Sequence, residues 1–449
     1  MNSTSPCRVA VIGAGAAGLT AMKELLEVGA EVVGYDKGDR PGGLWICGSS
    51  SGISPSYSSL HLNTSKGRTE FADFPMPEDW PDYPSVDRVA GYLGDYAEAF
   101  GLLPHLRFST TVNSVERDDS DGSWVVETEP GGVERFDAVV VANGHNWSPR
   151  WPTPPYPGAF DGLQMHAHDY MEADVFRDKR VLIVGMGNSA MDIAVDASFV
   201  SRGPVLLSAR RGVHIVPKYL FGRPADATGG AIAFLPWRLR QGVAETMLRL
   251  GVGKPQSYGL PAPAVGLFQN HPTISDTIMH RLTHGEVVAR PGVAELDGGL
   301  VKFADGRNDE VDVIVWATGY EVTIPFLSER WLGEDPERLP LYRRVFHLDD
   351  PTLAFVGLMQ STGAALPIVE QQSKLFAAYL GGRYALPAPA AQRKAVERSL
   401  AAASKRWGAS RPAMRVDFDR FVAELPREAK AGARRLRRGS GVQYEETAA

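Results

Sequence analysis

The stretch RVAVIGAGAAGLTAMKELLEVGAEVVGYD, residues 8–36, decides the fold of this chain. Its β-branched run at 8–12 predicts a strand, and Leu19, Met22 and Leu25 then recur at helical spacing until Gly29 can end the helix. A second strand is predicted at 31–35. A strand, a tight turn, a helix and a second strand in this order are typical of the first unit of a doubly wound α/β sheet.

The glycine turn between this strand and helix predicts a dinucleotide site. Gly13 allows the tight turn, Gly15 lets a pyrophosphate approach the backbone, and Gly18 allows close helix packing. Asp36 ends the second strand, where a carboxylate accepts ribose hydroxyls and repels a 2′-phosphate, which favours FAD or NAD over NADP. The predicted site comprises Gly13, Ala14, Gly15, Ala16, Ala17, Gly18, Asp36 and Lys37.

The same pattern returns in RVLIVGMGNSAMD at 180–192, with small residues at Gly185, Gly187 and Ala190. Ser208 stands where the first unit has its acid, and Arg210 and Arg211 follow it. A guanidinium there can bind a 2′-phosphate, so this second site is predicted to prefer NADPH over NADH. The alternative is that both arginines are ordinary solvated surface charges.

The two halves of the chain follow one plan. Residues 122–144 and 298–319 each read as hairpin strands that lead into an apolar strand. The proline-rich segment 149–157 predicts a connector between domains. We therefore expect two Rossmann-like α/β domains, with an NADP-binding domain at 156–325 inserted into an FAD-binding domain formed by 1–155 and 326–449.

Three further segments have simple interpretations. The serine-rich residues 49–59 predict a surface loop, and residues 85–100 predict a core helix with one apolar face. The basic residues at 427–438 are interpreted as a solvated tail rather than a docking site.

Composition narrows the class of protein. The 449 residues carry 47 basic and 53 acidic side chains, a formal net charge of -6, which argues against nucleic acid or anionic membrane as a partner. Cys7 and Cys47 are too few for a disulfide framework and predict no metal site. No signal peptide or apolar membrane span is visible, so we expect a cytoplasmic protein with a small-molecule substrate.

Several motifs resemble the flavin-containing monooxygenases over nearly the whole chain. FDGLQMHAHDY at 160–170 carries that family's FxGxxxHxxxY fingerprint at Phe160, Gly162, His166 and Tyr170. The related Baeyer-Villiger enzymes typically have Trp in place of the final Tyr, so Tyr170 favours the branch that oxygenates nitrogen and sulfur. Other matching segments are GGLW at 42–45, SLHLNTSK at 59–66, DFPMP at 73–77, ATGY at 317–320 and GLMQSTGAALPIVEQQ at 357–372.

The resemblance implies further site residues. Leu44 and Trp45 would line FAD, while Asn63, the candidate catalytic residue, and Thr64 would lie where flavin and nicotinamide meet. Leu62 replaces the family's usual Thr and removes one hydroxyl contact. The remaining cofactor contacts implied are Gln360 and, at the NADP site, Asn188, Ser189, Ala190, Met191 and Asp192.

The resemblance also implies the reaction. NADPH would reduce the flavin, O2 would convert the reduced flavin to a C4a-hydroperoxyflavin, and an amine nitrogen or sulfide sulfur would take the distal oxygen. Alternatives are Baeyer-Villiger oxygenation of a ketone, a flavin-dependent NADPH reductase, and a non-catalytic flavin-binding protein or redox sensor. His166 and His168 are interpreted as structural hydrogen-bonding residues, His61 has no assigned role, and a homodimer is possible.

Overall fold

Residues 8–36 supply two neighbouring strands of the first parallel sheet. In the computed structural model, which describes residues 6–269, 272–407, 411 and 413–444, that stretch forms β1 (Arg8–Ile12), α1 (Ala16–Glu27) and β2 (Glu31–Tyr35), as predicted. The sheet has the order β23-β7-β1-β2-β3 and its pairs are parallel. Its other strands are β3 (Leu106–Arg107), β7 (Ala138–Val141) and β23 (Leu353–Phe355).

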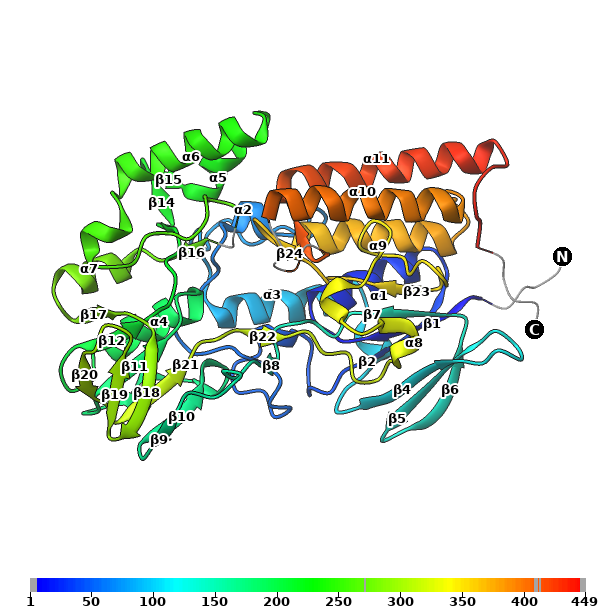
Figure 1. Ribbon diagram of the computed structural model, residues 1–449. Helices are drawn as coiled ribbons and strands as arrows, with labels where there is room; N and C mark the ends of the chain where they lie inside the picture. Colours follow the sequence, from blue (N-terminus) through cyan, green and yellow to red (C-terminus); the bar gives the residue numbers. More distant parts are fainter. Residues whose placement is uncertain (1–5, 270–271, 408–410, 412, 445–449) are drawn as a thin grey trace.

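Layers cover both faces of this sheet, which explains why its strands are apolar throughout. Val9 and Val11 of β1 point into one core cluster, and Ala10 and Ile12 point into another, as the two-residue period of a strand requires. Figure 1 shows helices stacked over one face and a small antiparallel sheet near the other. These layers are α1, α3 (Val86–Ala99), α9 (Leu366–Leu380), α10 (Pro389–Trp407) and α11 (Phe418–Arg437), and β4 (Thr111–Arg117), β5 (Trp124–Glu129) and β6 (Gly132–Phe136).

The second half repeats this arrangement. Its parallel sheet has the order β10-β21-β11-β12-β17, with β11 at the centre and α4 (Asn188–Ala197) directly after it. The strands are β10 (Leu163–His166), β11 (Val181–Val184), β12 (Val205–Ser208), β17 (Val287–Arg290) and β21 (Val313–Trp316). A second small sheet contains β9 (Gly158–Phe160), β18 (Val293–Gly298), β19 (Leu300–Phe303) and β20 (Asn308–Glu310). The predicted repetition of one plan is confirmed.

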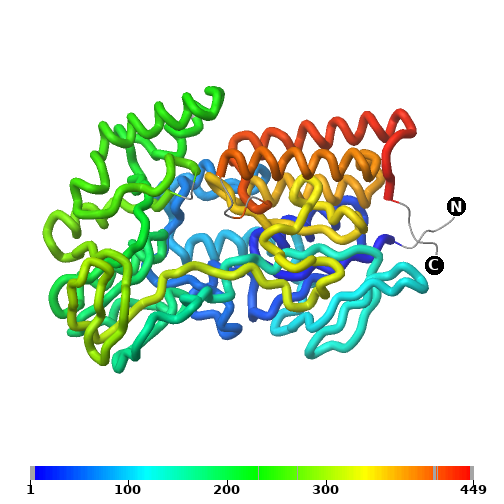
Figure 2. Tube along the Cα trace, viewed as in Figure 1, coloured from blue at the N-terminus to red at the C-terminus, as the bar shows by residue number. Residues whose placement is uncertain are grey.

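The chain crosses between the halves twice, at one place. β8 (Ser148–Pro149) leads out of the first half and β22 (Tyr320–Glu321) leads back, and these two strands pair antiparallel. Figure 2 follows both crossings along the trace. All strands of the second sheet therefore lie between the two crossings, while β23 of the first sheet lies after them.

A helical segment of the second half bridges toward the first half. It contains β13 (Ile215–Val216), β14 (Tyr219–Leu220), β15 (Arg223–Pro224), α5 (Ala225–Ala231), α6 (Trp237–Gly251) and β16 (Thr273–Ile274). The remaining helices and strands outside the 3-10 turns are α2 (Lys66–Thr69), α7 (Thr277–Thr283), α8 (Glu329–Leu332), β24 (Gln360–Ser361) and β25 (Arg415–Val416).

Two sequence interpretations are wrong. The segment 49–59 is not a plain surface loop, because Ser56 and Tyr57 are buried and Tyr57 packs in the core of the second half. Residues 427–437 are not a solvated tail but the last turns of α11, where Glu428 is buried between Arg435 of the same helix and Arg343 of a distant loop. The predicted core helix at 85–100 is confirmed as α3.

Neither a membrane-spanning helix nor a metal site is found in the described part of the chain. No helix there is both long and apolar enough to cross a bilayer. No group of three or more His, Cys, Asp and Glu side chains there is placed to hold a metal ion.

Candidate functional site

One large cavity lies at the carboxyl ends of both parallel sheets, the edge where doubly wound folds bind ligands. Its volume is about 940 Å³. The first residues after β1, β2, β7 and β21 line it, and so does Gly187, which follows β11. The predicted site residues that line it are Gly13, Gly15, Ala16, Ala17, Asp36, Lys37, Leu44, Trp45, Leu62, Asn63, Thr64, Gly187, Asn188, Ser189, Ala190 and Gln360.

The first glycine turn packs tightly against neighbouring backbone. Gly13 has a φ of +112°, and a Cβ there would lie 2.4 Å from the carbonyl oxygen of Ala142. A Cβ on Gly18 would lie 1.7 Å from the carbonyl oxygen of Gly13, so this glycine serves helix packing and does not face the cavity. Gly15 begins α1 without a side-chain cap, and the first turn holds no acid. The free amides at this helix start therefore suit a phosphate.

Asp36 lies at the cavity wall, where two backbone amides hold its carboxylate. Its Oδ2 accepts the Ala14 N–H at 2.5 Å, and its Oδ1 accepts the Gly38 N–H at 2.6 Å. Burial raises the pKa of Asp36, and these two hydrogen bonds oppose that shift. An ionised carboxylate has about four acceptor positions, so acceptor capacity remains for ribose hydroxyls. Ala14 itself turns its methyl into the core and contributes through its amide.

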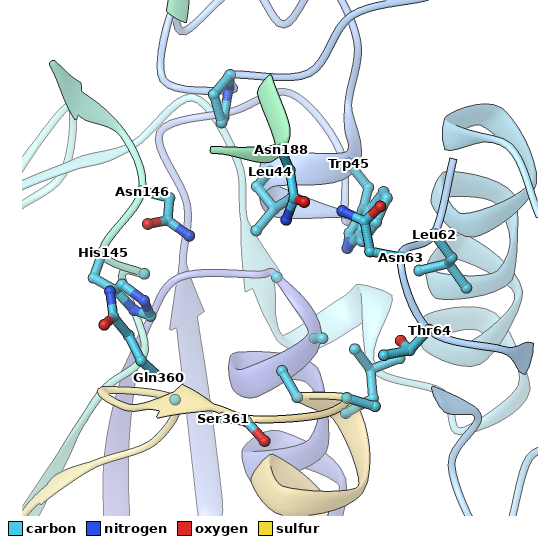
Figure 3. Close-up of a pocket in the computed structure, with 18 of the residues that line it drawn as sticks. Leu44, Trp45, Leu62, Asn63, Thr64, His145, Asn146, Asn188, Gln360 and Ser361 are labelled. Carbon is cyan, nitrogen blue, oxygen red and sulfur yellow. The ribbon is translucent and has the colours of Figure 1, made fainter. Parts of the chain in front are cut away.

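The Asn63 side chain faces the cavity. Among the described residues no group hydrogen-bonds its amide, although Thr64 next to it is anchored by its hydroxyl, 2.8 Å from that of Thr69. Figure 3 shows Asn63 near Leu44 and Trp45, with His145, Asn146 and Gln360 on the other side of the cavity. An amide that can both donate and accept is thus available to a bound molecule.

The second glycine turn has the same construction. Gly185 has a φ of +143°, and a Cβ there would lie 2.4 Å from the carbonyl oxygen of Ala317 on the neighbouring strand. Gly187 begins α4 without a side-chain cap or a first-turn acid. The Oδ1 of Asn188 accepts the Ile274 N–H at 2.8 Å, which ties this turn to β16. The cavity therefore contains two uncapped helix starts.

Three residues expected at the NADP site face elsewhere. Met191 is fully buried in the core of the second half. Asp192 accepts a hydrogen bond from the Tyr57 hydroxyl at 2.6 Å, and burial raises the pKa of Asp192 to about 6. Ser208 is buried and donates to the carbonyl oxygen of Pro291 at 2.7 Å. These side chains hold the turn in place rather than line the cavity.

Arg210 and Arg211 are exposed beyond the end of β12 and do not line the cavity. Neither makes a hydrogen bond or an ion pair with any described residue. The cavity wall near α4 instead includes Lys218. Burial lowers the pKa of Lys218, and the negative charges of Asp192 and Asp276 only partly oppose that shift. The cations available to a coenzyme phosphate are thus Arg210 and Arg211, which are exposed, and Lys218, which lies at the cavity wall.

Sequence reasoning missed His145 and Asn146, which line the cavity directly after β7. The signal was present, because side chains after the carboxyl end of a parallel strand face the ligand edge of the sheet. Burial, with the nearby positive charge of Arg411, lowers the pKa of His145 to about 4. His145 is therefore neutral near pH 7.

The histidine pair makes the predicted structural hydrogen bonds. His166 Nδ1 accepts the His168 N–H at 3.0 Å, and His168 Nε2 lies 2.9 Å from the carbonyl oxygen of Gly52. Burial lowers the pKa of His166 to about 4, so it is neutral near pH 7 and suited to accept this bond. The pair connects the crossing region to the serine-rich loop.

Comparison with known proteins identifies the family. Residues 6–433 match the family model described as flavin-binding monooxygenase-like. The chain belongs to this family. Flavin-containing monooxygenase 5 of Oryctolagus cuniculus is 36% identical over 409 residues, 85% of this chain and 74% of that protein. Dimethylaniline monooxygenase (N-oxide-forming) 2 of Mus musculus is 35% identical over 399 residues, 85% of this chain and 74% of that protein.

Similarity to a solved structure supports the assignment to this family. S-allyl-L-cysteine S-oxygenase from Allium sativum has a TM-score of 0.70 and 26% identity, covering 98% of this chain and 90% of that chain. This flavin-binding monooxygenase-like protein is therefore an FAD-dependent monooxygenase that uses NADPH and O2. The cavity fits these cofactors, because the uncapped starts of α1 and α4 both face it and their free amides suit phosphate groups.

Proposed function

We propose that this flavin-binding monooxygenase-like protein oxygenates the nitrogen of an amine or the sulfur of a sulfide in a small molecule. The observation that carries the proposal is that both glycine turns contribute to one cavity, together with the Asn63 amide, which no described residue hydrogen-bonds. The names of the N-oxide-forming relative and of the S-oxygenase support nitrogen and sulfur as the atoms oxygenated.

In this proposal each cofactor has its own half of the molecule. Residues 1–155 and 326–449 form the FAD domain, where the amides at the start of α1 bind the pyrophosphate and Asp36 binds the ribose. Residues 156–325 form the NADP domain, where the start of α4 binds the pyrophosphate and Arg210 and Arg211 take the 2′-phosphate. Bound there, the cofactors supply hydride transfer, O2 activation and oxygen transfer.

The chain's own side chains then orient the reactants and exclude water. Asn63 donates and accepts hydrogen bonds where the two cofactors meet, with Thr64 next to it and Gln360 on the opposite side of the cavity. Leu44, Trp45 and Leu62 supply apolar surface, which keeps water from the reacting atoms.

The location and assembly of the protein belong to the same proposal. Neither Cys7 nor Cys47 forms a disulfide in the described part of the chain, which supports a reducing, cytoplasmic setting. A homodimer is proposed and is tested by light scattering of the purified holoenzyme.

The test uses three probes with NADPH in air: N,N-dimethylaniline, methyl phenyl sulfide and cyclohexanone. We expect an N-oxide or a sulfoxide, with one oxygen atom from 18O2 in the product, and faster FAD reduction by NADPH than by NADH. The ketone is the control for Baeyer-Villiger chemistry. Lactone as the dominant product would replace the proposed substrate class, and NADPH oxidation without any oxygenated product would contradict it.

A further inference from the structure

The turn that carries Asn63 is held at its two ends by the first half of the molecule. Leu62 N–H donates to the carbonyl oxygen of Pro84 at 2.9 Å, and Lys66 N–H donates to that of Asp82 at 2.7 Å. Thr69 Oγ1 donates to the carbonyl oxygen of Ser65 at 2.9 Å. These bonds leave the N–H and hydroxyl of Ser65, two residues after Asn63, to find another acceptor.

That acceptor comes from the other half of the molecule. Asp226 Oδ2 accepts the Ser65 N–H at 2.7 Å and the Ser65 hydroxyl at 3.0 Å. Ser65 is only 6% exposed, so no bulk water competes for these donors. Ser65 precedes α2 but does not cap it, because its hydroxyl is engaged by Asp226. Figure 1 shows α2 beside α5, the helix that carries Asp226.

The position of Asp226 is itself well defined. Ala225 N–H donates to the carbonyl oxygen of Lys218 at 2.9 Å, and Asp226 Oδ1 accepts the Ala227 N–H at 2.9 Å. The carboxylate also lines the cavity. Asp226 is thus oriented from its own segment before it reaches Ser65.

Separate contacts dock this segment on the first half. The Tyr83 hydroxyl donates to the carbonyl oxygen of Lys218 at 2.5 Å, and the Tyr219 hydroxyl donates to Asp82. Neither contact touches residues 63–65. Removal of the Asp226 carboxylate therefore releases the turn while the segment stays docked.

We propose that Asp226 is a positioning residue that clamps the Asn63 turn to the NADP-side segment through Ser65. The proposal rests on the proposed function for its catalytic consequence, because the amide it positions is that of Asn63. Since the clamp joins residues 161 positions apart, the placement of Asn63 depends on how the segment 215–231 sits over the cavity. Oxygen transfer is then tied to a correctly docked NADP half.

Hydrogen–deuterium exchange of the full-length holoenzyme tests the clamp without any substrate. In Asp226→Ala, we expect the amides of the peptide spanning 62–69 to exchange about tenfold faster, since two hydrogen bonds to a charged acceptor are lost. Asp226→Asn keeps an acceptor oxygen and is expected to restore most of the protection. Tyr219→Phe is the matched control, because it removes a contact between the same segments and should leave this peptide unchanged.

The coupling of NADPH oxidation to product formation gives the second readout, on whichever probe the wild type oxygenates. We expect Asp226→Ala to form about tenfold less product per NADPH, Asp226→Asn to recover most of it, and Asn63→Ala combined with Asp226→Ala to match Asn63→Ala alone. Equal flavin content and equal melting temperature establish that each variant is folded.

The outcomes separate the two proposals. Unchanged exchange of the 62–69 peptide in Asp226→Ala overturns the clamp, and so does an equal rise in Tyr219→Phe. If Asp226→Ala and Asn63→Ala lower the product formed per NADPH by fully additive amounts, the link between Asp226 and Asn63 is overturned. If Asn63→Ala keeps wild-type coupling, the role proposed for Asn63 fails, while the exchange data still decide the clamp.

Discussion

At the scale of single residues, Asn63 carries the sharpest expectation. Asn63→Ala removes the only described amide side chain of its turn and leaves Asp36 and both glycine turns intact. NADPH oxidation is expected to continue, but with less product and more hydrogen peroxide, because nothing then orients the oxygen that is transferred. The measurement is the ratio of product to NADPH consumed. A wild-type ratio would make Asn63 a structural loop residue.

We propose that the two arginines after β12, Arg210 and Arg211, set the preference for NADPH over NADH. Arg210→Ala or Arg211→Ala is expected to lower the preference for NADPH over NADH by about 10- to 150-fold, the effect of losing one charged hydrogen bond to a phosphate. The readout is the ratio of flavin reduction rates with the two coenzymes. Arg202→Ala, before the other end of β12, is the control because Arg202 is also exposed. If both variants keep the preference, Lys218 at the cavity wall becomes the residue to test.

At the scale of elements, α11 depends on one buried carboxylate. Glu428 accepts hydrogen bonds from Arg435 at 2.5 Å, Arg343 at 3.0 Å and Tyr384 at 3.1 Å. Burial alone would raise the pKa of Glu428, but the two arginines lower it. Because the folded pKa lies below the ordinary value, this carboxylate stabilises the fold above about pH 4.5 and loses that effect as the pH falls through the folded pKa.

Glu428→Gln is therefore expected to lower the free energy of unfolding by about 1–3 kcal/mol at pH 7. The difference from wild type should shrink as the pH falls below about 4.5. Denaturant titrations at several pH values measure it. Glu424→Gln, one turn earlier and 48% exposed at its side chain, serves as the control and should change stability by less than about 0.5 kcal/mol. Equal effects of the two variants would contradict the role given to Glu428.

At the scale of the whole molecule, the shared cavity and the paired crossings join the two halves. We expect apoprotein to unfold in one transition, and FAD at about 100 times its Kd to add about 2.7 kcal/mol of stability. Divided by the unfolding entropy of a 449-residue chain, this free energy corresponds to a rise in melting temperature of about 3 °C. Scanning calorimetry with and without FAD measures it. Two transitions, of which FAD moves only one, would show that the halves unfold independently.

Much of the fold could be predicted from short stretches of the sequence. Both strand–turn–helix units were found from residues 8–36 and 180–192, because glycine turns and apolar periodicity depend on neighbours in sequence. The repeated plan followed, and most of the predicted site residues line the cavity, since the carboxyl ends of parallel strands meet at one edge. The burial of Tyr57 and the helix at 427–437 were missed, since the partners of Tyr57 and Glu428, Asp192 and Arg343, lie far away in the chain.

By itself, then, the sequence determined the two nucleotide-binding units, their order and the family motifs, all of which are short-range patterns. Only the tertiary structure decided which side chains reach the cavity: it placed His145, Lys218 and Asp226 there, and it left Arg210 and Arg211 outside. The reason is physical. A contact such as that of Asp226 with Ser65 spans 161 residues, and nothing in either local sequence specifies it until both sheets have packed.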